Sequence, residues 1–84
     1  MRRRVYSVTD AAFLDLVARV LQKRAPGRAG LLLETRERRL DNVTREELRG
    51  ILADELVEAG LAADSEPNAH GLMLEATIDW LGNR

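Results

Sequence analysis

The side chains best suited to metal or acid–base chemistry are few in this 84-residue chain. His70 is its only histidine, and cysteine is absent. A metal at His70 would need further ligands from other elements, such as Asp64 or Glu75, and the chain has no paired Glu-x-x-His spacing to supply them. We therefore predict no bound metal and no cofactor. His70 is interpreted as a partly buried or loop-capping residue, with a pH-sensitive contact as the alternative.

Catalytic nucleophiles are equally sparse. Serine occurs only at Ser7 and Ser65, and the six glycines are scattered, not gathered into a phosphate-binding loop. Ser65 is placed to cap the last expected helix. The acidic residues Asp54, Glu55 and Glu58 share a helix surface that we expect to face solvent. These observations predict that the protein is not an enzyme.

Charge is divided unevenly along the sequence. Residues 1–49 hold 12 Lys and Arg and 7 Asp and Glu, a net charge of +5, whereas residues 50–84 hold one Arg and 7 acidic residues, a net charge of −6. This division indicates either an anion-binding half or neutralisation between the two halves, within the fold or across a dimer. Neutralisation is the interpretation that we favour.

Nucleic-acid binding is the functional alternative. Arginine greatly outnumbers lysine, and its planar guanidinium suits bidentate contacts to phosphate. Few aromatic residues are present to stack on bases, however, and the last expected helix is too acidic and apolar to read DNA. The residues predicted to contact nucleic acid under this alternative are Arg2, Arg3, Arg4, Arg36, Arg38 and Arg39.

The elements that position these residues are all predicted to be helices, at about 9–25, 28–40, 44–59 and 66–81. In the first helix, five apolar residues recur at the spacing of one buried face: Phe13, Leu16, Val17, Val20 and Leu21. Thr9 is its expected N-cap, and Pro26 ends it. Residues 1–8, which are basic and β-capable, are expected to form a short extended arm.

The second and third helices differ in how clearly the sequence marks them. The second has a weak apolar pattern, and a short strand at 30–35 is the alternative. The third is expected to begin at a capping box formed by Thr44 and Glu47. Gly60 is expected to end it in the left-handed conformation that glycine adopts readily.

The fourth helix carries two apolar stripes. The first contains Leu72 and Ala76 and is expected to face the core. The second has few places to go in a thin four-helix monomer, and a helix that is apolar on two sides is buried on two sides. We therefore predict a subunit or partner contact through this second stripe, Leu74, Ile78 and Leu81, with Met73 and Trp80 of the first stripe nearby.

Together these observations predict a single all-α domain over residues 1–84, a small four-helix bundle. A chain of this size has a thin core, and oligomerisation is a natural way to bury more apolar surface. We predict a non-catalytic protein–protein interaction module, a homodimer that packs through its C-terminal helix, acting as an adaptor or an antitoxin- or immunity-like binder. The apolar runs are only a few residues long, and no apolar run follows the basic residues 2–4. We therefore expect a cytoplasmic protein with no membrane partner. We also expect the protein to be bacterial.

Overall fold

A computed structural model describes the backbone of residues 2–61 and 66–82, and within those ranges the side chains from residue 10 onward. Four helices follow one another: α1 (Arg2–Arg24), α2 (Gly30–Arg36), α3 (Asn42–Ala59) and α4 (Ala69–Gly82), with a 3₁₀ turn, η1 (Pro26–Arg28), between the first two. The predicted all-α, four-helix architecture is confirmed. Within the described ranges, no helix combines the length and apolar character that crossing a membrane requires.

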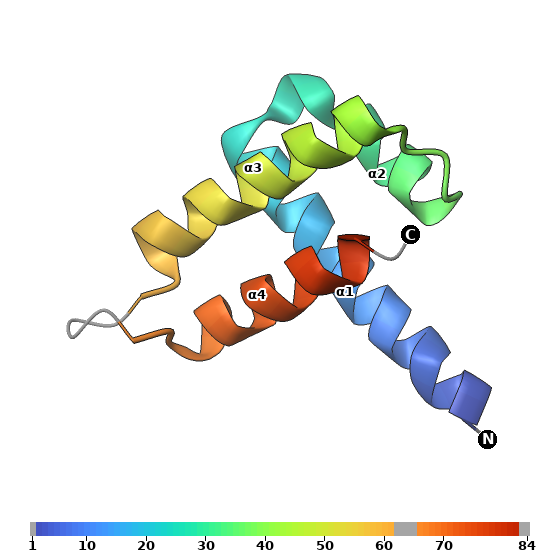
Figure 1. The fold of residues 1–84 in the computed structure, drawn as a ribbon, viewed down its shortest axis with the longest axis horizontal. Coiled ribbons are helices and arrows are strands. Elements are labelled where there is room, and N and C mark those ends of the chain that lie inside the picture. Colours follow the sequence, from blue (N-terminus) through green and yellow to red (C-terminus); the bar gives the residue numbers. More distant parts are fainter. Residues whose placement is uncertain (1, 62–65, 83–84) are drawn as a thin grey trace.

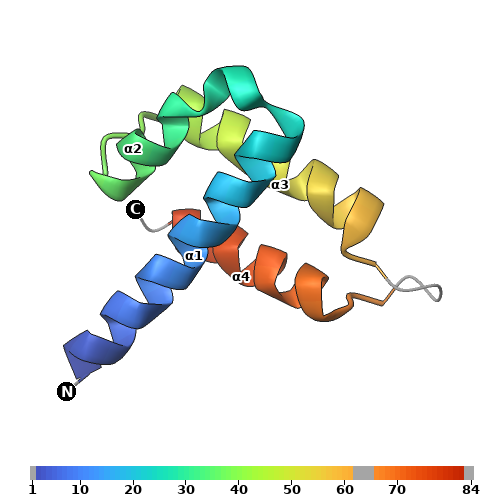
Figure 2. The same cartoon turned by 180° about the vertical axis from the view of Figure 1, so that it is seen from behind.

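Helices α3 and α4 form an antiparallel pair, and α1 crosses both of them (Figure 1). From behind, α1 and α2 lie in front of this pair, and the N-terminal turns of α1 extend beyond the other helices (Figure 2). Helix α1 supplies four of the buried core residues, as its apolar spacing predicted. The core consists of Leu16, Val17, Val20, Leu21, Leu31, Leu40, Leu48, Leu52, Leu74 and Leu81.

Helix α1 begins at Arg2, so residues 2–8 are helical and do not form the extended arm expected from the sequence. Thr9 therefore lies within the helix and is not its N-cap. The reason is cooperativity, because each residue added to an existing helix gains one hydrogen bond, and arginine is a good helix former. Neither proline nor glycine interrupts residues 2–24.

Helix α2 is shorter than the helix predicted at 28–40, and the strand alternative at 30–35 is wrong. The backbone N–H of Glu37 donates to the Leu33 carbonyl at 3.0 Å, and Arg38 then adopts a left-handed φ of 57°. The polar residues 36–39 offer no apolar side chain to hold another turn against α1. The chain instead leaves the helix and buries Leu40.

Helix α3 begins two residues earlier than predicted because Asp41 is its N-cap. The Asp41 carboxylate accepts a hydrogen bond from the backbone N–H of Thr44 at 2.8 Å, and the backbone N–H of Asp41 donates to Thr44 Oγ1 at 3.1 Å. The capping box therefore pairs Asp41 with Thr44, since aspartate is at least as good an N-cap as threonine. Glu47, left out of the box, binds Arg28 at 2.7 Å.

The end of α3 and the start of α4 meet at two glycines. Gly60 has a φ of −99°, so the left-handed end predicted for α3 is wrong. Gly60 instead allows the two helices to approach closely, because a Cβ on Gly60 would lie 2.9 Å from Gly71 Cα. A Cβ on Gly71 would in turn overlap the carbonyl oxygen of Gly60. Asn68 holds this crossing: its side-chain oxygen accepts from Gly71 N at 2.8 Å, and its own N–H donates to Gly60 O at 2.9 Å. The expected cap, Ser65, lies outside the described residues.

Candidate functional site

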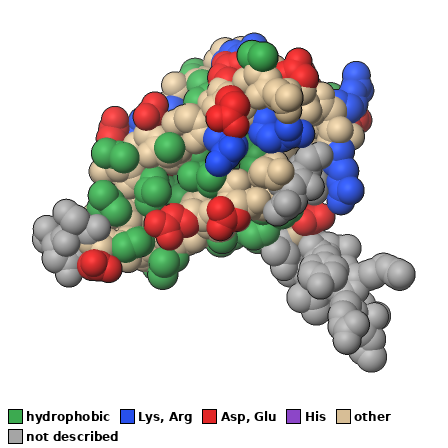
Figure 3. Space-filling model, viewed as in Figure 1, with side chains coloured by type: hydrophobic (Ala, Val, Ile, Leu, Met, Phe, Trp, Pro, Cys, Tyr) green, Lys and Arg blue, Asp and Glu red, His purple; other side chains and the backbone are tan. Residues whose placement is uncertain are grey.

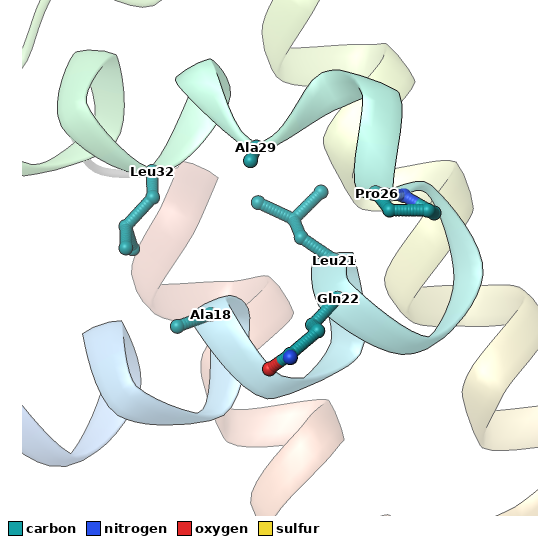
Figure 4. Close-up of a pocket in the computed structure, with 6 residues that line it drawn as sticks. All are labelled: Ala18, Leu21, Gln22, Pro26, Ala29 and Leu32. Carbon is teal, nitrogen blue, oxygen red and sulfur yellow. The ribbon is translucent and has the colours of Figure 1, made fainter.

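An apolar groove runs between α1 and α2. One part of it, about 310 Å³ in volume, is lined by Ala18, Leu21, Gln22, Pro26, Ala29 and Leu32 (Figure 4). The other part, about 380 Å³, is lined by Ala11, Leu14, Asp15, Ala18, Leu32 and Arg36. The two hollows share Ala18 and Leu32, so together they form one groove. Along α1 the groove extends from Ala11 to Gln22, about 17 Å at the helical rise of 1.5 Å per residue.

The sequence of α1 explains this groove. Ala11, Leu14 and Ala18 recur at spacings of three and four residues, which is the spacing of a helix seam that packs against another helix. Leu21 lines the same groove but is buried in the core. The seam lies beside the face that α1 turns to the core. Small alanines make it concave, and Figure 4 shows Leu32 projecting from α2 on the opposite wall. This alternation was visible in the sequence, but the stronger core pattern of α1 masked it.

The predicted contact on α4 requires correction. Leu74 and Leu81 are fully buried within the monomer, so they cannot form an interface while the chain keeps this fold. The two stripes were assigned in reverse order. The stripe of bulky residues faces the core, and the stripe rich in alanine faces outward, leaving Leu72 57% exposed. Burying leucine and isoleucine instead of alanine removes more apolar area from water, which decides which stripe turns inward.

The other three predicted contact residues are half-buried and occupied by neighbours within the chain. Trp80 Nε1 donates to Asp10 Oδ1 at 2.8 Å, and the Trp80 ring packs against Phe13 with centroids 5.0 Å apart. Met73 and Ile78 pack against the core. These contacts give α4 a structural role in holding α1.

The surface of α3 and α4 offers a second, weaker candidate. Figure 3 shows hydrophobic side chains over these two helices, interrupted by Asp and Glu. A shallow hollow of about 270 Å³ lies there, lined by Glu46, Arg49, Gly50, Ala53 and Ile78. Glu46 and Arg49 form an ion pair across one side of it, at 2.9 Å. The hollow therefore has less apolar wall than the groove between α1 and α2.

The basic residues fall into two groups. Arg36, Arg38 and Arg39 lie exposed at and after the end of α2, with Arg39 bound to Glu37 at 2.8 Å. The side chains of Arg2, Arg3 and Arg4 lie outside those that the structure describes. The second group consists of Lys23 and Arg24 at the end of α1, which form ion pairs with the negative half of the chain.

Ion pairs between α1 and α3 carry out this neutralisation. Arg24 contacts Glu55 at 2.7 Å and Glu58 at 2.9 Å, and Lys23 contacts Glu55 at 3.0 Å. Both basic residues belong to the positive half of the chain, and both acidic residues belong to the negative half. The division of charge along the sequence is therefore compensated, at these contacts, within the folded chain.

Glu55 stands at the centre of these contacts and contradicts the solvent-facing position expected for it. It is 4% exposed, on the buried side of α3 beside Leu48 and Leu52. His70 of α4 also reaches it, with 2.9 Å between His70 Nε2 and Glu55 Oε2. A carboxylate is tolerated there because three donors from α1 and α4 surround it. The sequence pattern was read as a solvent-facing position for Glu55, because its buried partners come from α1 and α4 and only the tertiary structure supplies them.

Two opposing effects set the acidity of Glu55. Burial raises its pKa, whereas hydrogen bonds from His70, Lys23 and Arg24 lower it and prevail, so that the pKa is about 2. The carboxylate therefore stays charged at neutral pH. Its chemistry is that of a fixed anion joining three helices.

Among the residues that the structure describes, no three His, Cys, Asp or Glu side chains gather where they could hold a metal ion. Comparisons with family models, curated proteins and solved structures find no match to this chain.

Proposed function

We propose that this chain is a non-catalytic protein–protein interaction module, and that its groove between α1 and α2 binds an amphipathic helix. One observation carries the proposal: the two hollows join into a single apolar groove about 17 Å long, with one wall on each of two helices. Such grooves take a partner helix through side chains at spacings of three and four residues. Three turns of helix fill this length.

The side chains of the groove suit this role. Leu14, Ala18 and Leu32 are only half-buried in the free chain, so a docked helix removes further apolar surface from water. Burying a large apolar side chain completely contributes about 1.5–3 kcal/mol before entropic costs. Asp15 and Arg36 supply a polar rim of both charge signs, which favours one orientation of the partner.

The role that fits such a groove is that of an adaptor, or of an antitoxin- or immunity-like binder that covers its partner. Nucleic-acid binding draws less support, because Lys23, Arg24, Arg28 and Arg39 already bind carboxylates of the same chain. These ion pairs offset the charge of the four residues, and Arg39 is the one among them that was predicted to contact nucleic acid.

Photo-crosslinking tests the proposal. A benzoylphenylalanine in place of Gln22, at the exposed edge of the groove, should join the chain to one protein species in the cells that produce it. The same group in place of Val57, which is 69% exposed on α3, serves as the matched control. Mass spectrometry identifies the adduct.

We expect the adduct from position 22 to disappear when Ala18→Arg places a charge on the groove floor, while circular dichroism shows that the chain still folds. The position 57 control should give no discrete adduct. If position 22 labels no more protein than position 57, the groove does not bind a partner and the proposed function is wrong.

A further inference from the structure

The groove between α1 and α2 is positively charged at one end only. Resting on the proposed function, we propose that the helix bound there carries Asp or Glu in the terminal turn that lies over the end of α2 and the start of α1. The partner is therefore an amphipathic helix that is acidic at one end. The apolar walls of the groove hold this helix, and the charges select it.

The two hollows of the groove differ in charge. The hollow of about 310 Å³, beside η1, has no charged residue in its lining. The hollow of about 380 Å³ has Arg36 on its α2 wall. Residues 36–39 hold three arginines against one glutamate, and all four are exposed. Figure 3 shows Lys and Arg side chains at the edge of the molecule where α2 ends. The positive charge is therefore concentrated at this end of the groove.

The acidic residues near this end bind within the chain. Asp15 lines the same hollow, and its carboxylate lies 3.3 Å from the guanidinium of Arg19 on α1. Glu37 binds an arginine of its own segment at 2.8 Å. Asp10 accepts a hydrogen bond from Trp80 Nε1, on the side of α1 that faces α4. Because each of the two ion pairs is neutral as a unit, the net charge at the end of α2 stays positive.

The start of α1 adds positive charge at the same end. Residues 2–4 are all arginine, and α1 is helical from Arg2 onward. Its N-terminal turns extend beyond the other helices (Figures 1 and 2). Arg4 stands seven residues before Ala11 and fourteen before Ala18, so helical periodicity places it in the register of the groove. A partner helix that continues past the groove lies alongside these turns.

Charge complementarity favours an acidic helix over a basic one. Asp or Glu beside a net positive surface is attracted to it, whereas Lys or Arg in the same place is repelled. The end beside η1 offers no such preference, because Lys23 and Arg24 there bind carboxylates of α3. The asymmetry therefore also sets the direction of the bound helix. Each exposed contact adds little affinity, so the charges choose the partner while the apolar walls supply most of the binding.

Selection from a displayed library of helices tests the proposal, with the full chain as the target. Each member has about 18 residues, enough to span the groove and the first turns of α1. Leucine and alanine are fixed along one stripe, and the polar positions carry Glu, Lys or Gln at random. Counter-selection against Ala18→Arg, which places a charge on the groove floor, restricts the count to binders that need the groove. Sequencing of the bound members gives the ratio of Glu to Lys at each position.

We expect groove-dependent binders to prefer Glu over Lys by at least about tenfold in one terminal turn, with no preference in the other. The variant Arg4→Gln/Arg36→Gln/Arg38→Gln should reduce this preference to about threefold or less. Arg49→Gln, on α3 outside the groove, should leave it unchanged. Circular dichroism of each variant shows that the chain still folds.

The other outcomes separate this inference from the proposed function. Groove-dependent binders with equal Glu and Lys at both ends, or with Lys preferred, would overturn the acidic partner and leave the proposed function standing. A Glu preference that survives in full in the triple variant would also overturn it, because the arginines would not be its cause. If no binder is lost with Ala18→Arg, both the acidic partner and the proposed function are wrong.

Discussion

Glu55 is a buried carboxylate that three helices share. Lys23 and Arg24 approach it from the C-terminal end of α1, and His70 approaches from α4. Removing any one donor leaves the others to bind the carboxylate, but removing the carboxylate leaves three donors facing a buried position without their anion. Glu55 therefore matters more to the fold than the exposed acidic residue Glu58, although both contact Arg24.

The pH dependence of stability follows from Glu55. Its pKa falls from the ordinary 4.5 to about 2 in the folded chain, so its contribution is complete above pH 4.5 and is lost as the pH falls towards 2. The loss should be about 1–3 kcal/mol, since Lys23 and His70 are partly exposed to solvent. Urea unfolding followed by circular dichroism at pH 7, 5, 3 and 2 measures it.

The variant Glu55→Gln should be less stable than the parent at pH 7, and its free energy of unfolding should fall less between pH 5 and 2. Glu58→Gln is the control, because the Glu58 side chain is 68% exposed and its removal should leave the acid dependence nearly unchanged. Equal acid sensitivity of Glu55→Gln and the parent would show that the Glu55 contacts do not stabilise the fold.

At the scale of elements, the positions where helices begin and end depend on contacts that sequence spacing does not encode. The spacing of Thr44 and Glu47 fits a capping box, yet Asp41 caps α3 and uses Thr44 as its partner. Gly60 reads as a left-handed helix end, yet its backbone is right-handed and its small size admits α4. In both cases the residue types were informative and the register was decided by neighbouring residues.

The glycine crossing between α3 and α4 yields a stability prediction. Gly71→Ala should destabilise the chain by about 2–4 kcal/mol or prevent folding, because the added Cβ would overlap the Gly60 carbonyl. Gly50→Ala is a matched control in the middle of α3, where no atom lies within 4 Å of the added Cβ. It should stabilise the chain by about 0.5–1 kcal/mol. Chemical unfolding of both variants checks this, and a neutral Gly71→Ala would contradict the close crossing.

At the scale of the whole molecule, the fold was more predictable than the site. Apolar periodicity placed all four helices, and the core face of α1 from Phe13 to Leu21 was read correctly. Periodicity could not choose which stripe of α4 turns inward, because it marks both stripes as apolar and does not compare the apolar area that each one buries. The groove was missed because Leu14 and Ala18 sit beside a stronger pattern, and the wall that makes them concave comes from α2.

The groove also changes how the charged halves of the chain are understood. The positive and negative halves form ion pairs within the monomer, between Lys23 and Arg24 on α1 and Glu55 and Glu58 on α3. The binding proposed for the groove between α1 and α2 rests on its apolar walls, so it should respond to substitutions in the groove more than to salt.

Photo-crosslinking from position 22, in the parent chain and in Ala18→Arg, tests the central claim that the groove is an interaction surface most directly. The parent should give one discrete adduct. Ala18→Arg places a charge at the middle of the groove and should weaken binding by roughly a hundredfold, so the adduct should disappear while the helical circular dichroism stays unchanged. An adduct of equal yield from the parent and the variant would contradict the claim, because the groove would then play no part in binding.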